Sequence, residues 1–388
     1  MKIVIAPDKF KGSLSAPEVC DAIARGVRRV LPKAHIVKVP LADGGEGTVQ
    51  ALVTAAQGRF KTGRVTGPLG RKVTARIGLI DGGTTAVIEM AAASGLALIP
   101  KAKQNPLRTT TFGTGELIAM ALQLGVTRII LGIGGSATND GGAGMAMALG
   151  IRLLDKRGES IGFGGGALSK LSRIDLTNSR FPVSSVRVSV ACDVRNPLCG
   201  PRGASAVYGP QKGATPKEVG VLDRNLLHYA KIVERDVLKP RDGALSGQSL
   251  HKLPGTGAAG GLGYGLCAFL NARIERGIDL VLDHLDFGKI IKGVDLVITG
   301  EGAIDEQTSH GKVPVGVALR AKKLGIPVIA LGGTVPPCAN MVFDHGIDGI
   351  MSLCHSPMTL EAAVSQAGPL LELASERMLR LVLLGGKL

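Results

Sequence analysis

Glycine-rich segments that carry acidic, basic or hydroxyl side chains recur along this 388-residue chain. Glycine lets the backbone approach a phosphate closely, lysine neutralises its charge, and carboxylates bind Mg²⁺ or accept a proton. Together these groups are the parts needed for phosphoryl transfer, in which catalysis is mainly positioning and charge neutralisation. The candidate residues are Asp8, Lys9, Lys11, Asp43, Glu46, Gly134, Gly135, Ser136, Thr138, Asn139, Asp140, Asp193, Lys212, Glu301, Asp305 and Lys312.

Several of these segments follow short apolar runs that we interpret as buried strands. The runs cover residues 3–6, 36–39, 128–131, 186–190 and 296–299. In open parallel sheets, ligands bind in the loops at the carboxyl ends of the strands. A single Asp in a glycine loop is more often a turn former than a catalyst. Because several such loops follow strands, the pattern favours a nucleotide-using enzyme.

Strand and helix signals alternate at both ends of the chain. A helix is expected to begin at Ser15, which forms a capping box with Glu18. Residues 65–90 indicate two or three antiparallel strands, and residues 155–255 are expected to be rich in loops. The sequence therefore predicts an α/β protein in which residues 1–64 and 285–388 form one parallel-sheet domain, with an inserted mixed α/β domain over residues 65–284.

Composition narrows the class of partner. Apolar residues make up 45% and charged residues 20%, which is typical of a soluble globular protein. The formal net charge of +15 could suit nucleic acid, but aromatic residues are 3% with no Trp, so a base-stacking surface is hard to build. We therefore expect a small-molecule substrate, with neither nucleic acid nor membrane as partner. The six cysteines form no C-x-x-C pair, and no secretory signal is visible, which favours a cytoplasmic protein.

Two segments resemble nucleotide-binding motifs, but each lacks a part of the motif. Residues 132–137 fit a loose dinucleotide pattern after a strand, but the acid about twenty residues on, Asp155, heads a turn with Gly158. An NAD(P)-dependent reductase of a small hydroxy acid therefore remains the alternative function. Lys312 follows a glycine but precedes Val313, so no Walker loop is present.

The ordered set of motifs resembles the type-1 family of bacterial glycerate kinases over essentially the whole chain. The strings that carry the resemblance are APD at 6–8, FKG at 10–12, ADGGEGT at 42–48, GGSATNDGG at 134–142, ACD at 191–193, NPL at 196–198, GPQKGA at 209–214 and ITGEG at 298–302. The resemblance implies ATP- and Mg²⁺-dependent phosphorylation of D-glycerate to 2-phosphoglycerate, with 3-phosphoglycerate as the other product to consider. It also implies two domains, one of them flavodoxin-like or Rossmann-like, with the active site in the cleft between them. The chain is expected to act as a monomer or homodimer.

The resemblance implies a role for each candidate residue. Asp193 or Asp43 would take the proton of the substrate hydroxyl, and Glu46, Glu301 and Asp305 would hold Mg²⁺. The remaining candidates would bind phosphate or carboxylate groups: Lys11, Lys212 and Lys312 as clamps, and Asp8, Lys9, Gly134, Gly135, Ser136, Thr138, Asn139 and Asp140 as substrate or nucleotide contacts.

Three positions depart from the family pattern. Lys9 stands where the family usually has Ser, Ala303 where it usually has Arg, and Arg195 where a small or acidic residue is common. We hypothesise that Lys9 supplies the positive charge that an arginine at position 303 would otherwise provide.

Overall fold

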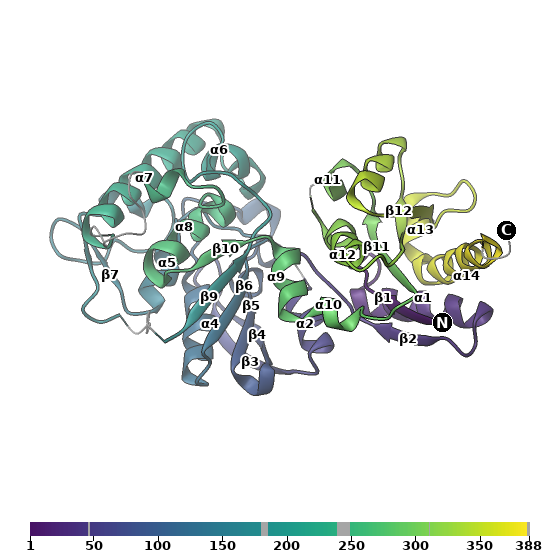
Figure 1. Ribbon diagram of the computed structural model, residues 1–388. Helices are drawn as coiled ribbons and strands as arrows, with labels where there is room; N and C mark the ends of the chain where they lie inside the picture. The colour runs from purple at the N-terminus through teal and green to yellow at the C-terminus, as the bar shows by residue number, and fades with distance from the viewer. Residues whose placement is uncertain (46, 180–184, 239–248, 310, 386–388) are drawn as a thin grey trace. The chain divides into compact units, whose positions relative to one another are not determined.

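The chain folds into two units, each built around its own main sheet (Figure 1). The computed structural model describes residues 1–45, 47–179, 185–238, 249–309 and 311–385. Unit 1 comprises Met1–Asp43, Gln50–Gln57 and Ile278–Leu388, and unit 2 comprises Gly44–Val49 and Gly58–Gly277.

Unit 1 contains a five-stranded sheet in which every described pair is parallel. Its order is β13-β12-β11-β1-β2, which is 2-1-3-4-5 when the strands are counted along the chain, the order of a doubly wound sheet. The strands are β1 (Lys2–Ile5), β2 (His35–Lys38), β11 (Leu296–Ala303), β12 (Val328–Thr334) and β13 (Gly349–Ser352). The helices are α1 (Ala16–Val30), α2 (Thr48–Ala55), α9 (Gly277–His284), α10 (Phe287–Ile290), α11 (Glu306–Ser309), α12 (Val313–Lys322), α13 (Leu360–Ser365), α14 (Ala367–Gly385) and the 3₁₀ segment η7 (Pro337–His345).

Helix α1 begins as its sequence predicts. The Glu18 carboxylate accepts a hydrogen bond from the Ser15 N–H at 2.8 Å, which satisfies a donor that the first helical turn leaves open. Val19, Ile23 and Val27 form one apolar face at helical spacing and are fully buried. Helix α1 packs against α14 so closely that a Cβ at Gly26 would lie 2.2 Å from the Glu372 carbonyl oxygen.

Apolar side chains of the central strands point alternately to the two faces of this sheet, so helices must pack on both faces. Ile3 and Ile5 of β1 belong to the apolar cluster that also includes residues of α1 and α14. Val4 is equally buried and points to the opposite face. Helix α12 packs against β11. The sheet is therefore buried on both sides, and its polar loops gather at its edges.

Unit 2 is built on a mixed six-stranded sheet of order β10-β9-β6-β5-β4-β3. Strands β3, β4 and β5 pair antiparallel, whereas β5, β6, β9 and β10 pair parallel. The strands are β3 (Arg59–Thr66), β4 (Lys72–Ile80), β5 (Thr85–Glu89), β6 (Arg128–Gly132), β9 (Arg187–Ala191) and β10 (Arg273–Glu275), and β7 (Arg152–Leu154) pairs with β8 (Arg173–Asp175) in a separate ribbon. The helices are α3 (Ala91–Ser94), α4 (Phe112–Gln123), α5 (Ala143–Ala148), α6 (Ala204–Tyr208), α7 (Pro216–Asp236) and α8 (Ala258–Leu270). The 3₁₀ segments are η1 (Asp81–Gly83), η2 (Leu96–Leu98), η3 (Lys101–Lys103), η4 (Ala167–Lys170), η5 (Pro210–Lys212) and η6 (Leu250–Lys252).

The α/β class with one parallel and one mixed sheet is confirmed, and so is the antiparallel pairing expected within residues 65–90. The region 155–255, expected to be rich in loops, also contains the long helix α7, which runs for 21 residues and was not expected. Its start carries a capping box between Thr215 and Glu218, a signal that was present in the sequence.

The unit boundaries lie close to the expected domain boundaries but not on them. Residues 58–64 belong to unit 2 because β3 pairs along its whole length with β4. At the other boundary unit 1 resumes at Ile278 rather than at residue 285. Ile278 packs against α12, where a Cβ at Gly316 would lie 2.4 Å from its side chain.

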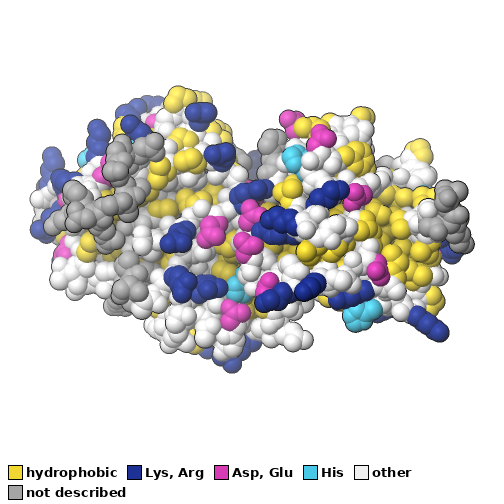
Figure 2. Space-filling model, in the orientation of Figure 1, with side chains coloured by type: hydrophobic (Ala, Val, Ile, Leu, Met, Phe, Trp, Pro, Cys, Tyr) yellow, Lys and Arg dark blue, Asp and Glu magenta, His cyan; other side chains and the backbone are white. Residues whose placement is uncertain are grey.

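Three further observations concern surface charge, the hydropathy of the helices and the cysteines. On the face drawn in Figure 2, Lys and Arg side chains are spread over both units and interspersed with Asp and Glu. Across the part of the chain that the structure describes, no helix is both long enough and apolar enough to span a membrane. All six cysteines are free thiols.

Candidate active site

The carboxyl ends of β1 and β11 form the point at which the strand order of unit 1 reverses. Asp8 lies just beyond β1, and its N–H donates to the Gly300 carbonyl oxygen at 2.8 Å. The Thr299 hydroxyl donates to the Ala6 carbonyl oxygen at 2.8 Å and joins the same two strands. Such a reversal point is where open α/β sheets bind their ligands. The sheet therefore brings Asp8 and Glu301 to one ligand-binding edge, as their positions after strands predict.

Asp8 is a buried carboxyl group in acidic surroundings. Its side chain is 7% exposed, and its Oδ1 accepts the Lys9 N–H at 2.6 Å. Burial is the largest cause that raises the pKa of Asp8 from 3.8 to about 7, and the nearby Asp43 carboxylate raises it further. Glu301 adds to the same effect. A carboxyl group poised near neutral pH is suited to accept a proton from a substrate hydroxyl.

Glu301 is held by two partners at the end of β11. Its Oε1 accepts a short hydrogen bond from the Thr308 hydroxyl, and its Oε2 lies 3.6 Å from the Lys312 ammonium. Burial raises the pKa of Glu301, while Thr308 and Lys312 lower it. Thr308 is fully buried and also accepts the Asp305 N–H at 3.0 Å. Sequence reasoning missed Thr308, because a Thr outside the glycine motifs carries no distinguishing local signal.

The other unit 1 candidates surround these two carboxyl groups less closely. Asp43 and Lys9 are half-buried and Lys11 is exposed. A Cβ at Gly302 would lie 3.4 Å from the Lys11 backbone nitrogen, so the loop after β1 runs beside the end of β11. A further candidate, Glu46, lies outside the described residues.

In unit 2 the loop after β6 presents two glycines to solvent above a buried polar segment. Gly134 and Gly135 are exposed, and Gly135 adopts a φ of +71°, which favours glycine. From Ser136 to Asp140 every residue is buried. The exposed backbone of the two glycines is therefore the part of this loop that an anion can reach.

Lys212 does not reach a surface from which it could clamp a ligand. Its side chain is 2% exposed, and its ammonium donates to the Ser136 hydroxyl at 2.8 Å and to the Thr138 carbonyl oxygen at 2.7 Å. Burial lowers the pKa of Lys212 to about 7, and the nearby Asp140 carboxylate opposes that change. The contacts of Lys212 are thus internal to the loop that was expected to bind nucleotide.

Asp140 and Asn139 are likewise internal. Asp140 is fully buried and accepts from the Thr111 N–H at 2.8 Å and from the Thr111 hydroxyl at 2.9 Å. The Asn139 amide donates to the Ser205 hydroxyl at 2.9 Å. No local motif marks Thr111 or Ser205 as a partner of these two residues.

Asp193 follows β9 and is exposed. Its Oδ1 accepts the Gly277 N–H at 3.0 Å, where α9 begins. The side chain therefore has a structural contact in addition to the catalytic role expected from the sequence.

Asp155, the acid expected about twenty residues after the glycine loop, does not lie where a dinucleotide site requires it. In the dinucleotide fold that acid follows the strand next to the glycine-loop strand. Here β6 lies between β5 and β9, whereas β7, which precedes Asp155, belongs to the separate ribbon. Asp155 instead accepts the backbone N–H groups of Arg157 and Glu159 at 2.8 and 3.0 Å, as expected of a turn former.

Among the described residues, no three or more His, Cys, Asp and Glu side chains are grouped to hold a metal ion by themselves. Mg²⁺ needs no such group, because it usually binds one or two carboxylates together with substrate phosphates and water. Glu301 and Asp8 offer buried carboxyl oxygens whose pKa values are raised partly by other carboxylates. A divalent cation at this edge would relieve that repulsion, so the donor chemistry fits Mg²⁺.

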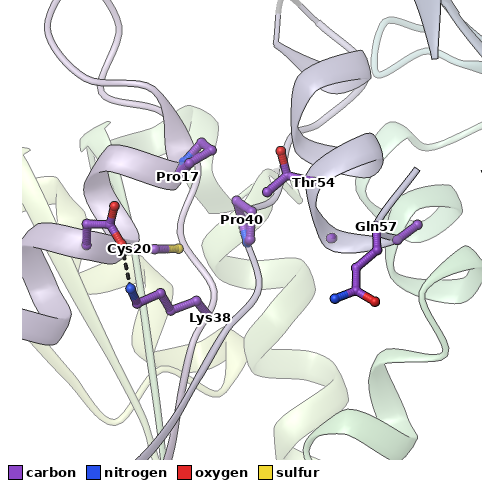
Figure 3. A pocket seen from close by; sticks show the side chains of 9 residues that line it. Pro17, Cys20, Lys38, Pro40, Thr54 and Gln57 are labelled. Atoms are coloured by element: carbon purple, nitrogen blue, oxygen red, sulfur yellow. Dashed lines mark hydrogen bonds and ion pairs between the residues drawn. The ribbon is translucent and has the colours of Figure 1, made fainter. Parts of the chain in front are cut away.

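A pocket of about 470 Å³ opens elsewhere in unit 1, between α1, the end of β2 and the end of α2 (Figure 3). Lys38 and Asp21 at its wall form an ion pair at 2.5 Å, and the Cys20 thiol donates to the Ile5 carbonyl oxygen at 3.7 Å. None of the candidate site residues lines this pocket.

Comparison with known proteins identifies the family of the chain. The model of the "Glycerate kinase family" matches residues 3–383. The chain is 54% identical to the protein named glycerate kinase from Bacillus subtilis, covering 96% of this chain and 95% of the relative. It is 51% identical to the protein named glycerate 2-kinase from Escherichia coli K12, covering 94% and 93%. A crystal structure from Salmonella typhimurium LT2, described as that of a candidate glycerate kinase 2, covers 100% of both chains with 48% identity and a TM-score of 0.89.

Proposed function

Because the chain belongs to the glycerate kinase family, we propose that it transfers the γ-phosphoryl group of ATP to the 2-hydroxyl of D-glycerate. The observation that carries the choice of hydroxyl is the similarity over nearly the whole chain to a protein named glycerate 2-kinase. The cluster of Asp8, Asp43 and Glu301 at the reversal point of the unit 1 sheet supports the chemistry. A cytoplasmic location and a monomeric or homodimeric state stay predictions.

The proton of the substrate hydroxyl needs an acceptor, and we assign this role to Asp8. The hydroxyl oxygen bonds to the γ-phosphorus, the bond from that phosphorus to the ADP oxygen breaks, and the hydroxyl proton passes to the Asp8 carboxylate. Sequence reasoning placed Asp8 among the binding residues and gave the base role to Asp43 or Asp193. Asp8 is favoured because it is the buried one of the three and its pKa of about 7 matches the task.

Glu301 is the carboxylate we assign to Mg²⁺, with Asp305 and Glu46 as further contributors. When bound, Mg²⁺ neutralises charge that develops on the transferred phosphoryl group. Thr308 and Lys312 hold Glu301 in place. In unit 2, the backbone N–H groups of the exposed residues Gly134 and Gly135 are assigned to nucleotide phosphates. Lys9 and Lys11 on the loop after β1 are assigned to the anionic groups of the substrate.

The product distinguishes the two hydroxyl groups directly. Enolase uses 2-phosphoglycerate, so coupling the reaction to enolase without phosphoglycerate mutase reports phosphorylation at the 2-hydroxyl. We expect phosphoenolpyruvate to form at the rate at which ADP is released. Formation that requires added mutase would show that the 3-hydroxyl is used.

Asp193→Asn separates a catalytic from a capping role for Asp193. Because the hydroxyl proton is assigned to Asp8, we expect a near-normal kcat, whereas a fall of about 10²-fold would return the base role to Asp193. The melting temperature should hardly change, because the Asn oxygen can still accept the Gly277 N–H. A near-normal kcat together with a lower melting temperature of Asp193→Ala would show that Asp193 only caps α9.

Lys9→Ser tests the hypothesis that Lys9 replaces an arginine at position 303. We expect kcat/KM for glycerate to fall about tenfold, the cost of one charge-assisted contact. Adding Ala303→Arg should recover a large part of the loss, although the guanidinium fork is not a copy of an ammonium. Simple additivity of the two changes in a double-mutant cycle would refute the compensation.

A further inference from the structure

A buried cation lies beneath the glycine loop of unit 2 and bonds to two points of it. Lys212 is the last residue of η5, and its ammonium donates to the Ser136 hydroxyl at 2.8 Å and to the Thr138 carbonyl oxygen at 2.7 Å. Only 2% of Lys212 is exposed. Removing an ammonium from water is costly unless it is paired, so these contacts fix where the segment 136–138 can lie.

A buried anion anchors the other end of the same segment. Asp140 accepts from both donors of Thr111 and from the backbone N–H groups of Gly142 and Gly144 at 3.2 and 3.3 Å. Its charge acts on Lys212, where it opposes the fall in pKa that burial causes. The segment is therefore held by two buried side chains, Lys212 at Ser136 and Thr138 and Asp140 at its far end.

Neutral contacts complete the support of this segment. The Thr109 hydroxyl donates to the Ala137 carbonyl oxygen at 2.7 Å, and the Ala137 N–H donates to the Ser94 carbonyl oxygen at 2.9 Å. Directly before this supported segment lie Gly134 and Gly135, which are exposed. Two adjacent glycines have wide conformational freedom, so their orientation depends on the segment that follows them and on the Leu96 N–H, which donates to the Gly135 carbonyl oxygen at 2.9 Å.

We propose that Lys212 is a positioning residue whose buried ammonium fixes Ser136 and Thr138, so that the amides of Gly134 and Gly135 are held ready for a nucleotide phosphate. Asp140 anchors the far end of the segment in the same way. The identity of the ligand in this assignment rests on the proposed function. The support of the loop by Lys212 is independent of that function. Lys212 acts through the loop and makes no contact with substrate.

The test compares Lys212→Met with Lys217→Met, an exposed lysine on α7. Hydrogen exchange of the ligand-free protein should be faster across residues 133–138 in Lys212→Met and unchanged elsewhere in unit 2. Kinetics should show KM for ATP raised about tenfold or more, with KM for glycerate unchanged, because misplaced binding groups lose affinity for one ligand only. Lys217→Met should match the wild-type protein in both measurements.

Ser136→Ala removes one hydrogen-bond acceptor of the Lys212 ammonium and leaves Lys212 in place. This variant replaces Lys212→Met in the test if Lys212→Met does not fold. It should give the same local increase in exchange to a smaller degree. Unchanged exchange at residues 133–138, or a uniform loss of all kinetic constants in step with a lower melting temperature, would overturn the proposal. A wild-type protein without glycerate-dependent turnover would contradict the proposed function, whereas the exchange experiment would still decide the role of Lys212.

Discussion

Asp8→Asn is expected to lower kcat/KM for glycerate by about 10³-fold and, at the same time, to stabilise the ligand-free protein at pH 8. The loss of rate follows because Asn cannot take the hydroxyl proton. The gain in stability follows because ionised Asp8 is buried beside Asp43 and Glu301, and a neutral amide removes that repulsion. The Asn oxygen can still accept the Lys9 N–H.

The gain in stability that Asp8→Asn brings should increase as pH rises. The folded-state pKa of Asp8, about 7, lies above its ordinary value of 3.8, so between these values the folded protein binds more protons than the unfolded chain. This contribution to stability is present below pH 3.8 and is lost as pH rises through 7. The melting temperature of Asp8→Asn relative to the wild-type protein should therefore increase from pH 4 to pH 8.

Asp344→Asn is the matched control, because Asp344 is an exposed carboxylate in unit 1. It should change neither the rate nor the pH dependence of melting. If Asp8→Asn keeps more than about a tenth of the wild-type kcat/KM, Asp8 is not the proton acceptor, since general-base catalysis contributes at least 10²-fold.

Glu301→Gln should produce the second large effect, a fall of about 10²- to 10³-fold in kcat/KM for ATP measured across a series of Mg²⁺ concentrations. Gln keeps the shape of Glu301 but not its charge, so it binds Mg²⁺ weakly and leaves Lys312 without its ionic partner. Raising the Mg²⁺ concentration should restore part of the activity. Thr308→Val removes only the hydroxyl that holds Glu301 and should cost less, about 10- to 10²-fold.

Glu361→Gln, at an exposed position of α13, is the control for the loss of a carboxylate. It should leave the Mg²⁺ dependence unchanged. Wild-type kinetics for Glu301→Gln at every Mg²⁺ concentration would remove Glu301 from the metal site, and the other carboxylates of unit 1 would have to be tested in its place.

The sequence predicts the meeting of Asp8 and Glu301 for a physical reason. Both lie at the ends of apolar strands, and parallel strands in one sheet open at one edge, so no knowledge of packing is needed. The capping box at Ser15 also predicts the start of α1. The same signal at Thr215 marks the start of α7, a helix that the expectation of a loop-rich region did not include.

The environment of each charge could not be predicted in this way. Lys212 looks like a phosphate clamp when only its charge and its neighbouring glycines are known, yet folding buries it beneath the loop of unit 2. No local sequence pattern identifies Thr308, because its role depends on the short helix α11, which places it beside the end of β11. Burial arises from contacts far apart in the chain, so local patterns give residue types and spacing but not pKa values.

The central claim is tested most directly by following ADP release and NADH in parallel coupled assays of the purified protein. We predict that ADP release requires both D-glycerate and Mg²⁺, and that NAD(H) is neither consumed nor formed. Absence of glycerate-stimulated ADP release at every Mg²⁺ concentration tried, or consumption of NADH with a hydroxy-acid partner, would contradict the assignment of this chain as an ATP-dependent kinase of glycerate.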